Sequence, residues 1–183
     1  EWFISRKLDG GRCLCIIRKD STKDQVTFFS REGKKFETLG KIKDEIIEKI
    51  VPHLKTDIVI DGEVCLIENG AESFSGIMKL IKKINYTIEN PKYIVFDLLT
   101  LKEFLDNTSS RILSERLKIC SKIMKKTKKT EFIRLLNQYN YTQEKFDEMT
   151  GYVAEKGWEG LMLRKDVGYE AKRTKNLLKV KKF

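Results

Sequence analysis

The sequence has one histidine, two prolines and no long hydrophobic run. With His53 as the only imidazole, a Ser-His-Asp triad and a histidine-bound zinc site are both poorly supported. No apolar run approaches the roughly 18 residues that span a bilayer, so we expect no membrane partner. The cysteines match no zinc spacing, and we expect reduced core thiols in an intracellular protein, cytoplasmic or nuclear. They are Cys13, Cys15, Cys65 and Cys120.

Charge is plentiful and unbalanced. The 183 residues include 37 lysines and arginines against 27 acidic residues, which gives a net charge of +10. A basic balance of this size is typical of proteins with a polyanionic partner, because cations that contact phosphates release counterions. The alternative is a charged surface that only keeps the protein soluble. Charge alone therefore names no function.

Strand patterns dominate the first third of the chain. Alternating apolar residues predict strands over Trp2–Leu8, Arg12–Lys19 and Gln25–Ser30. The break at Asp9-Gly10-Gly11 predicts a tight hairpin turn between the first two.

Helices and strands interleave irregularly in the rest of the chain, which predicts an α+β fold with antiparallel sheets in place of regular βαβ repeats. Helical spacing of apolar residues predicts helices over Lys41–Ile50, Ser73–Ile84, Ser114–Lys126 and Thr142–Lys156. Strands are predicted over Asp57–Ile67 with a bend at Asp61-Gly62, Tyr93–Thr100, Glu131–Leu135, Gly160–Arg164 and Leu177–Lys182.

A lysine at a strand end opens the most informative segment, Lys7-Leu8-Asp9-Gly10-Gly11-Arg12. Such a position projects an amine at an edge where a ligand can bind, and glycines let the backbone approach that ligand closely. An amine is a nucleophile only when deprotonated, and the flanking cations Arg6 and Arg12 would lower its pKa. On its own, however, the pattern also fits an exposed hairpin with a surface lysine.

Four further segments place polar groups at the ends or in the middle of predicted strands. They are Ser30–Gly33, Asp61–Glu63, Glu159–Arg164 and Lys179–Lys181. An arginine in a turn suits a phosphate, a carboxylate within an apolar stretch needs a ribose hydroxyl, a metal or a cation as partner, and alternating lysines share a strand face. Each segment alone could serve an ion pair or a solvated surface, but together they suggest one shared site.

In this order the segments resemble the motifs of the covalent nucleotidyltransferases, namely ATP-dependent DNA ligases, RNA ligases and mRNA capping enzymes. The resemblance runs from Lys7 to Lys181. It implies an adenylation domain over residues 1–183 with two antiparallel β-sheets flanked by helices. The Lys-Leu-Asp-Gly and Glu-Gly-Leu-Met-Leu-Arg segments favour a DNA ligase. The alternatives are an RNA ligase or a capping guanylyltransferase and, more remotely, a non-catalytic basic nucleic-acid-binding module.

The resemblance also implies a role for each motif residue. Lys7 would attack ATP and carry AMP as a covalent adduct, Arg12 would lie near the ribose, and Arg31 would contact a phosphate of the nucleotide or the nick. The remaining implied contacts are Ser5 with adenine, Glu63 with a ribose hydroxyl, Phe96 stacked on the purine, Glu159 with Mg²⁺ or Mn²⁺, and Lys179 and Lys181 with the α-phosphate. Among these, Lys7, Arg12, Lys179 and Lys181 are the expected catalytic residues.

The implied partners are ATP and nicked double-stranded DNA. Ligases that this chain resembles continue after the last motif into an OB-fold domain. Because the chain stops at Phe183, shortly after Lys181, we expect an isolated catalytic domain without the OB-fold and amino-terminal DNA-binding domains. The OB-fold domain would then belong to the full-length enzyme, which we expect to act as a monomer.

Overall fold

The computed structural model describes residues 1–107, 111–127, 129–172 and 174–181. Its strands are β1 (Trp2–Arg6), β2 (Gly11–Ile17), β3 (Val26–Phe29), β4 (Lys35–Phe36), β5 (Ile58–Cys65), β6 (Ile67–Glu68), β7 (Ala71–Glu72), β8 (Lys92–Thr100), β9 (Ile133–Leu135), β10 (Tyr139–Asn140), β11 (Leu161–Lys165) and β12 (Leu177–Val180). Its helices are α1 (Gly40–Lys49), the 3₁₀ turn η1 (Val51–His53), α2 (Phe74–Leu80), α3 (Leu101–Asp106), α4 (Leu113–Lys126) and α5 (Gln143–Lys156).

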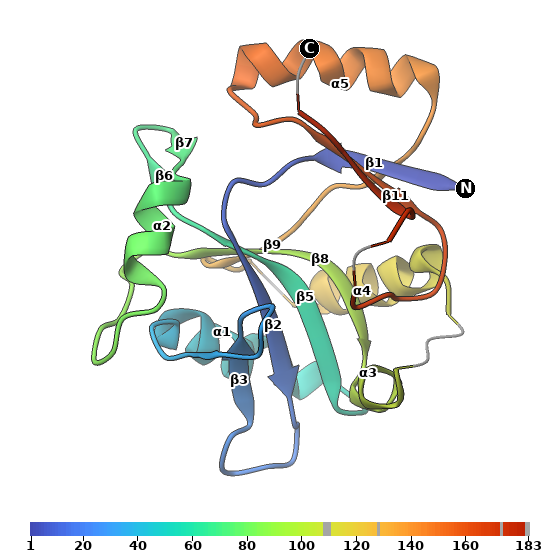
Figure 1. The fold of residues 1–183 in the computed structure, drawn as a ribbon. Coiled ribbons are helices and arrows are strands. Elements are labelled where there is room, and N and C mark those ends of the chain that lie inside the picture. Colours follow the sequence, from blue (N-terminus) through green and yellow to red (C-terminus); the bar gives the residue numbers. More distant parts are fainter. Residues whose placement is uncertain (108–110, 128, 173, 182–183) are drawn as a thin grey trace.

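Two sheets organise these elements (Figure 1). The larger has the strand order β4-β3-β2-β5-β8-β9 and the smaller β10-β1-β11-β12, while β6 and β7 form a separate hairpin. The predicted α+β fold, with two sheets and flanking helices, is confirmed. The prediction that the sheets are antiparallel throughout is wrong at β9, which runs parallel to β8. The chain passes through α3 and α4 between these strands, and a helical crossover brings it back in the same direction.

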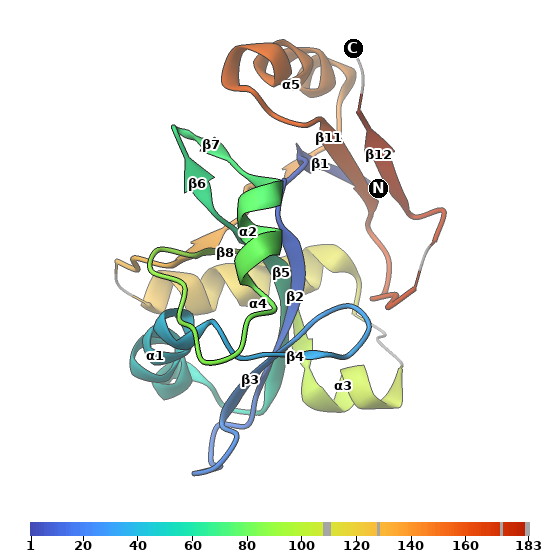
Figure 2. The ribbon, with the colours of Figure 1, turned by 60° about the vertical axis from the view of Figure 1, so that its left-hand side comes forward.

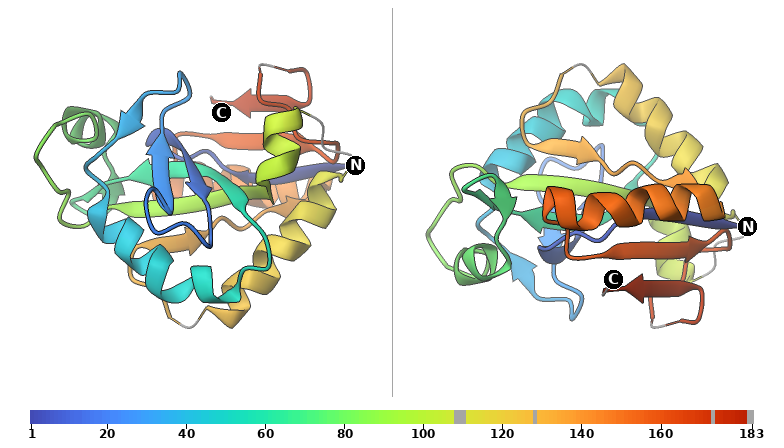
Figure 3. Two further views of the ribbon diagram at one scale, coloured as in Figure 1. Left: turned by 90° about the horizontal axis from the view of Figure 1, so that it is seen from below. Right: turned by 90° about the horizontal axis from the view of Figure 1, so that it is seen from above.

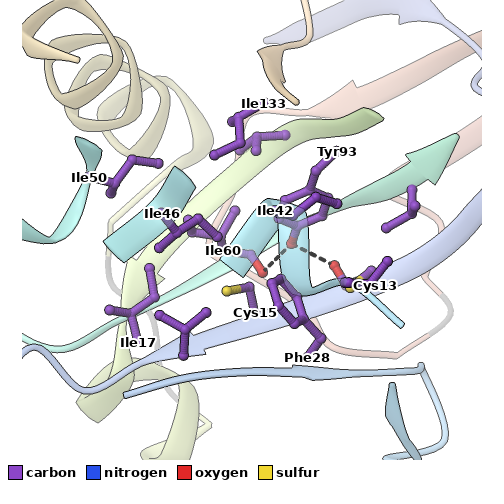
Figure 4. Packing of buried hydrophobic residues seen from close by; sticks show 14 of the residues in the cluster. Cys13, Cys15, Ile17, Phe28, Ile42, Ile46, Ile50, Ile60, Tyr93 and Ile133 are labelled. Atoms are coloured by element: carbon purple, nitrogen blue, oxygen red, sulfur yellow. Dashed lines mark hydrogen bonds between the residues drawn. The ribbon is translucent and has the colours of Figure 1, made fainter. Parts of the chain in front are cut away.

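The main core lies between the larger sheet and the helices α1 and α4. Strand residues such as Cys15 and Ile17 pack there with Ile42 and Ile46 of α1, as Figure 4 shows. Tyr93 is fully buried among them, and its hydroxyl donates a hydrogen bond to the Cys13 carbonyl at 2.8 Å. All four cysteines are buried and free, as predicted.

A smaller core joins α5 to the four-stranded sheet. Met149 of α5 packs against Ile4 of β1 and Leu161 of β11, and Figure 3 shows the helix lying across these strands. Thr142 caps the helix by accepting a hydrogen bond from the Lys145 amide, a contact that satisfies one of the free N–H groups of the first turn. The helix therefore covers one face of this sheet and leaves the other face free to form a site.

The predicted hairpin at Asp9-Gly10-Gly11 is wrong. β1 pairs with β10 and β11, whereas β2 pairs with β3 and β5, so the segment carries the chain from one sheet into the other (Figure 2). A Cβ atom on Gly10 would lie 2.4 Å from the Val64 carbonyl oxygen. This close backbone approach requires a glycine at position 10. The hairpin prediction failed because a local turn signal cannot distinguish a hairpin from a crossover.

The predicted bend of β5 at Asp61-Gly62 is confirmed as a shift of register against β8. A Cβ atom on Gly62 would lie 2.4 Å from the Ile94 carbonyl oxygen. A bulge of this kind re-aims the side chains around it. Asp61 and Glu63, two residues apart on this strand, both line one cavity between the sheets.

The remaining predicted elements appear with small changes of length. α2 ends at Leu80, four residues earlier than predicted, and Phe74 on its expected apolar face is half exposed. The two-residue strands β4, β6, β7 and β10 and the helix α3 were not predicted. No helix in the described ranges is long and apolar enough to cross a membrane.

Candidate active site

A cavity of about 630 Å³ lies between the two sheets. Its wall comes from the end of β1, from β2, β5 and β8 of the larger sheet, and from β11, β12 and the connection between them. Six of the predicted site residues line it, namely Lys7, Arg12, Arg31, Glu63, Phe96 and Lys179. Glu159 lies beside the lining, in contact with Lys7. Motifs far apart in the sequence therefore meet at one place.

Lys7 lies directly after the end of β1, where this first strand meets residues from the last part of the chain. Its amide donates to the Gly160 carbonyl at 2.8 Å, which extends the pairing of β1 with β11. Its Nζ donates to Oε1 of Glu159, and Nζ of Lys181 lies 3.6 Å from the same oxygen. Glu159 thus joins two lysines that are 174 positions apart in the chain, although Lys181 is the more exposed of the two.

Asp9 is a member of this group to which the sequence assigned no role. Burial, a hydrogen bond with Glu159 and the negative charge of that residue together raise the pKa of Asp9 to about 6. For Glu159, burial opposes the charged form, but the hydrogen bonds from Lys7 and Asp9 outweigh it and lower the pKa. Asp9 is therefore the member of the pair that takes up a proton first as the pH falls. In the sequence, only the position of Asp9 two residues after Lys7 could have indicated that it belongs to the site.

The two arginines that flank Lys7 in sequence both have carboxylate partners. Nη1 of Arg6 lies 2.7 Å from Oε2 of Glu72, and Nε of Arg12 donates to Oδ1 of Asp61 at 2.6 Å. The expectation that these cations act on the Lys7 amine is weakened, because each is neutralised locally.

Glu63 lies on the cavity wall beside the crossover. Its Oε1 accepts a hydrogen bond from the Gly10 amide at 3.1 Å. Burial raises the pKa of Glu63 to about 7 in spite of that hydrogen bond and of nearby cations. Near neutral pH the carboxyl group can therefore accept a hydrogen bond from a hydroxyl group or, when protonated, donate one to it.

Two guanidinium groups contact the Phe96 ring. Cζ of Arg164 is 4.4 Å and Cζ of Arg12 is 5.4 Å from the ring centroid. Arg164 also donates to the Ser5 hydroxyl at 3.0 Å, and burial lowers its pKa. Ser5 is 1% exposed and is not part of the cavity wall, so in this structure its hydroxyl positions Arg164. The sequence motif contained Arg164 but gave no sign of this stacking.

Two acid–arginine pairs form the floor of the cavity. Tyr169 donates to Oδ2 of Asp61 at 2.7 Å, so that Asp61 has both an arginine and a phenol as partners. Arg116 from α4 donates to both oxygens of Asp97, at 2.8 and 3.0 Å. Of the partners that the sequence left open for a carboxylate in this stretch, Asp61 has a cation, Arg12. Tyr169 and Arg116 could not be found from sequence because neither lies in a recognisable motif.

Arg31 and Lys179 lie on the exposed rim of the same cavity. No group of three or more histidine, cysteine or acidic side chains that could hold a metal occurs in the described parts of the chain. Glu159 remains the only predicted metal ligand.

A family model described as ATP dependent DNA ligase domain matches residues 1–181. No protein with a curated description matches the chain. Many solved structures do, and three of them illustrate the range. A structure described as Pmar-Lig_Pre. is 30% identical with a TM-score of 0.83, and the match covers 99% of this chain and 42% of that one.

The other two are more distant in sequence. The ATP-dependent DNA ligase from bacteriophage T7 in complex with ATP is 14% identical with a TM-score of 0.73, over 98% of this chain and 61% of that one. The Chlorella virus DNA ligase-adenylate is 18% identical with a TM-score of 0.68, over 98% of this chain and 60% of that one. These two similarities concern the fold alone.

Proposed function

The chain belongs to the family of ATP dependent DNA ligase domains, and on that basis we propose that it is an adenylation domain in which Lys7 becomes covalently attached to AMP. The chain spans 42% of the Pmar-Lig_Pre. structure, so the activity of a whole ligase is itself part of the proposal. The observation that carries it is the group formed by Lys7, Glu159 and Lys181 at the cavity between the sheets.

In the proposed reaction the Lys7 amine attacks the α-phosphorus of ATP. A nitrogen–phosphorus bond forms, the bond to pyrophosphate breaks, and AMP remains on the lysine. Glu159 already accepts a hydrogen bond from Nζ, so it can orient the amine, while the proton that the ammonium group must lose passes to water. Lys179 and Lys181 would neutralise the α-phosphate, because phosphoryl transfer depends mainly on positioning and charge stabilisation.

The rest of the cavity would hold the nucleoside. Glu63 would bind a ribose hydroxyl, Arg12 would lie near the ribose, and Phe96 would stack on the purine. Because guanidinium groups already contact the Phe96 ring, the base would join or replace one of them. Ser5 would then act on adenine through Arg164, which its hydroxyl holds.

A divalent cation fits this site only with the help of the substrate. Glu159 offers a single carboxylate, and Mg²⁺ typically takes one or two carboxylates together with substrate phosphates and water. When bound, Mg²⁺ or Mn²⁺ would neutralise charge on the phosphates. Arg31 on the rim would contact a phosphate of the nucleotide or of the nick.

We further infer that AMP passes from Lys7 to the 5′-phosphate of a nick in double-stranded DNA, which is then sealed. The net charge of +10 supports a polyanionic substrate. An OB-fold domain as partner in a longer enzyme, a monomeric state and an intracellular setting are the corresponding expectations for the whole protein.

Intact mass spectrometry tests the proposal directly. The protein is incubated with Mg²⁺ and either ATP or GTP, and its mass is measured after denaturation. We expect a covalent increase of one adenylate with ATP and no guanylate adduct with GTP. A guanylate adduct would favour a capping enzyme, and the absence of any adduct would contradict nucleotidyl transfer.

A further inference from the structure

A second cavity, of about 440 Å³, lies beneath α5 between the two sheets. Its wall comes from the ends of β5 and β8, from the β9–β10 segment and from one side of α5. Arg6 lines this cavity as well as the nucleotide cavity. Arg6 directly precedes Lys7 in the chain, so the two cavities adjoin next to Lys7. None of the motifs described above assigns a role to the second cavity.

The wall of this cavity is strongly basic. Five cations line it against two carboxylates, Glu72 and Glu148. Both acids are already paired, Glu72 with Arg6 at 2.7 Å and Glu148 with Lys145 at 3.3 Å. The other three cations, which we call the cavity cations, form no ion pair within the described ranges. They are Lys92, Arg134 and Lys156.

Contacts with the protein hold the cavity cations in place. Nζ of Lys156 lies 4.6 Å from the centroid of the Tyr152 ring and 5.8 Å from that of Trp158. Nζ of Lys92 and Nη1 of Arg134 both donate to the Glu131 carbonyl, at 2.8 and 3.0 Å. Side chains that are ordered in advance lose less conformational entropy when a ligand binds.

We propose that this cavity binds phosphate groups of the DNA strand that continues from the nick. Three positive charges without acidic partners suit the phosphates of a nucleic-acid backbone, because each phosphodiester carries one negative charge. The shared Arg6 places the cavity next to the end of the strand that Lys7 would adenylate. The inference rests on the proposed function for the identity of the strand, whereas the site itself rests on the cavity and its cations.

A charge-matched pair of triple variants tests the site. One variant is Lys92→Gln/Arg134→Gln/Lys156→Gln. The control is Lys122→Gln/Lys125→Gln/Lys126→Gln, which removes the same charge from three exposed lysines of α4. Affinity for a fluorescent nicked duplex is measured over a range of salt concentrations, and AMP adduct formation and thermal unfolding are measured in parallel.

We expect the cavity variant to bind DNA about tenfold or more weakly, with the slope of log K against log salt reduced by about 2 to 3. The control should lose about threefold at most, as expected for a general change of charge. Both variants should form the AMP adduct like the wild type. Equal losses in the two variants, or no loss in the cavity variant, would overturn the proposal. An absent AMP adduct in the wild type would instead contradict the proposed function.

Trp158 provides a local signal from within the cavity. In a Trp2→Phe background it is the only tryptophan, and we expect its fluorescence to change on titration with nicked DNA and to recover at high salt. The change should disappear in the cavity variant. An equal response to polyglutamate at the same concentration of charge would identify an acidic-peptide site, and that outcome would also overturn the proposal.

Discussion

Lys7 is the residue whose replacement separates chemistry from fold. Lys7→Arg keeps the positive charge beside Glu159 but removes the lone pair that attack requires, because the guanidinium group stays protonated. We expect the variant to form no AMP adduct while its thermal unfolding stays close to that of the wild type. Mass spectrometry after incubation with ATP measures the adduct, and undiminished labelling would contradict the assignment.

Phe96 has two possible functions that substitution can separate. It is buried in a small cluster with Leu8, Ile94 and Leu136, so Phe96→Ala should lower stability by about 3 kcal/mol or more. Phe96→Leu retains most of the buried volume and loses only the aromatic face. We expect Phe96→Leu to weaken ATP binding by about 0.5–1.5 kcal/mol, measured by calorimetry on folded protein. Unchanged affinity would leave Phe96 as a core residue only.

Glu63 should make stability depend on pH. Its folded-state pKa of about 7 lies above the ordinary 4.5, so the folded protein binds this proton more tightly than the unfolded chain does. The resulting stabilisation is complete below about pH 4.5 and is lost as the pH rises through 7. Relative to Glu63→Gln, the wild-type melting temperature should therefore fall over this interval. A difference that does not vary with pH would contradict the raised pKa.

At the level of the elements, periodicity was a reliable guide where a strand or helix is long. The buried run of β8 and the helical spacing in α1, α4 and α5 predicted these elements to within a few residues. Two-residue strands such as β4 and β10 carry no periodicity, since their pairing partners alone define them. Pairing itself is not local either, which explains both the parallel β9 and the mistaken hairpin after β1.

The crossover from β1 to β2 gives a matched test of glycine at adjacent positions. A Cβ atom on Gly10 would lie 2.4 Å from a backbone oxygen, whereas one on Gly11 would meet only side-chain atoms at 3.6 Å. We expect Gly10→Ala to cost about 1–3 kcal/mol of stability and to reduce the AMP adduct, because Lys7 lies just before it. Gly11→Ala should behave nearly like the wild type, and equal effects in the two variants would show that the close approach is unimportant.

In the whole molecule, the ordered motifs located the cavity but not the contacts within it. Lys7, Glu159 and Lys181 meet as one group, although nearly the whole chain separates the first from the last. By contrast, Tyr169 and Arg116 contribute to the floor through hydrogen bonds that only the folded chain creates. Roles that depend on a bound nucleotide stay predictions, because motif order carries no geometry.

The last prediction concerns which steps of ligation residues 1–183 can carry out alone, adenylation or nick sealing. The group around Lys7 and the wall of the nucleotide cavity lie within this one chain, so adenylation from ATP should proceed without other components. The matched T7 and Chlorella virus structures are longer than this chain, which spans 61% and 60% of them. If the additional part helps to hold DNA, the basic surface of residues 1–183 must bind the duplex alone, weakly and with steep salt dependence.

We therefore expect AMP labelling to far exceed sealing of a nick, even one that is already 5′-adenylated. Both are measured side by side, with and without an added OB-fold domain. Efficient sealing by residues 1–183 alone at physiological salt would contradict this division, because it would mean that one basic surface positions both ends of the nick.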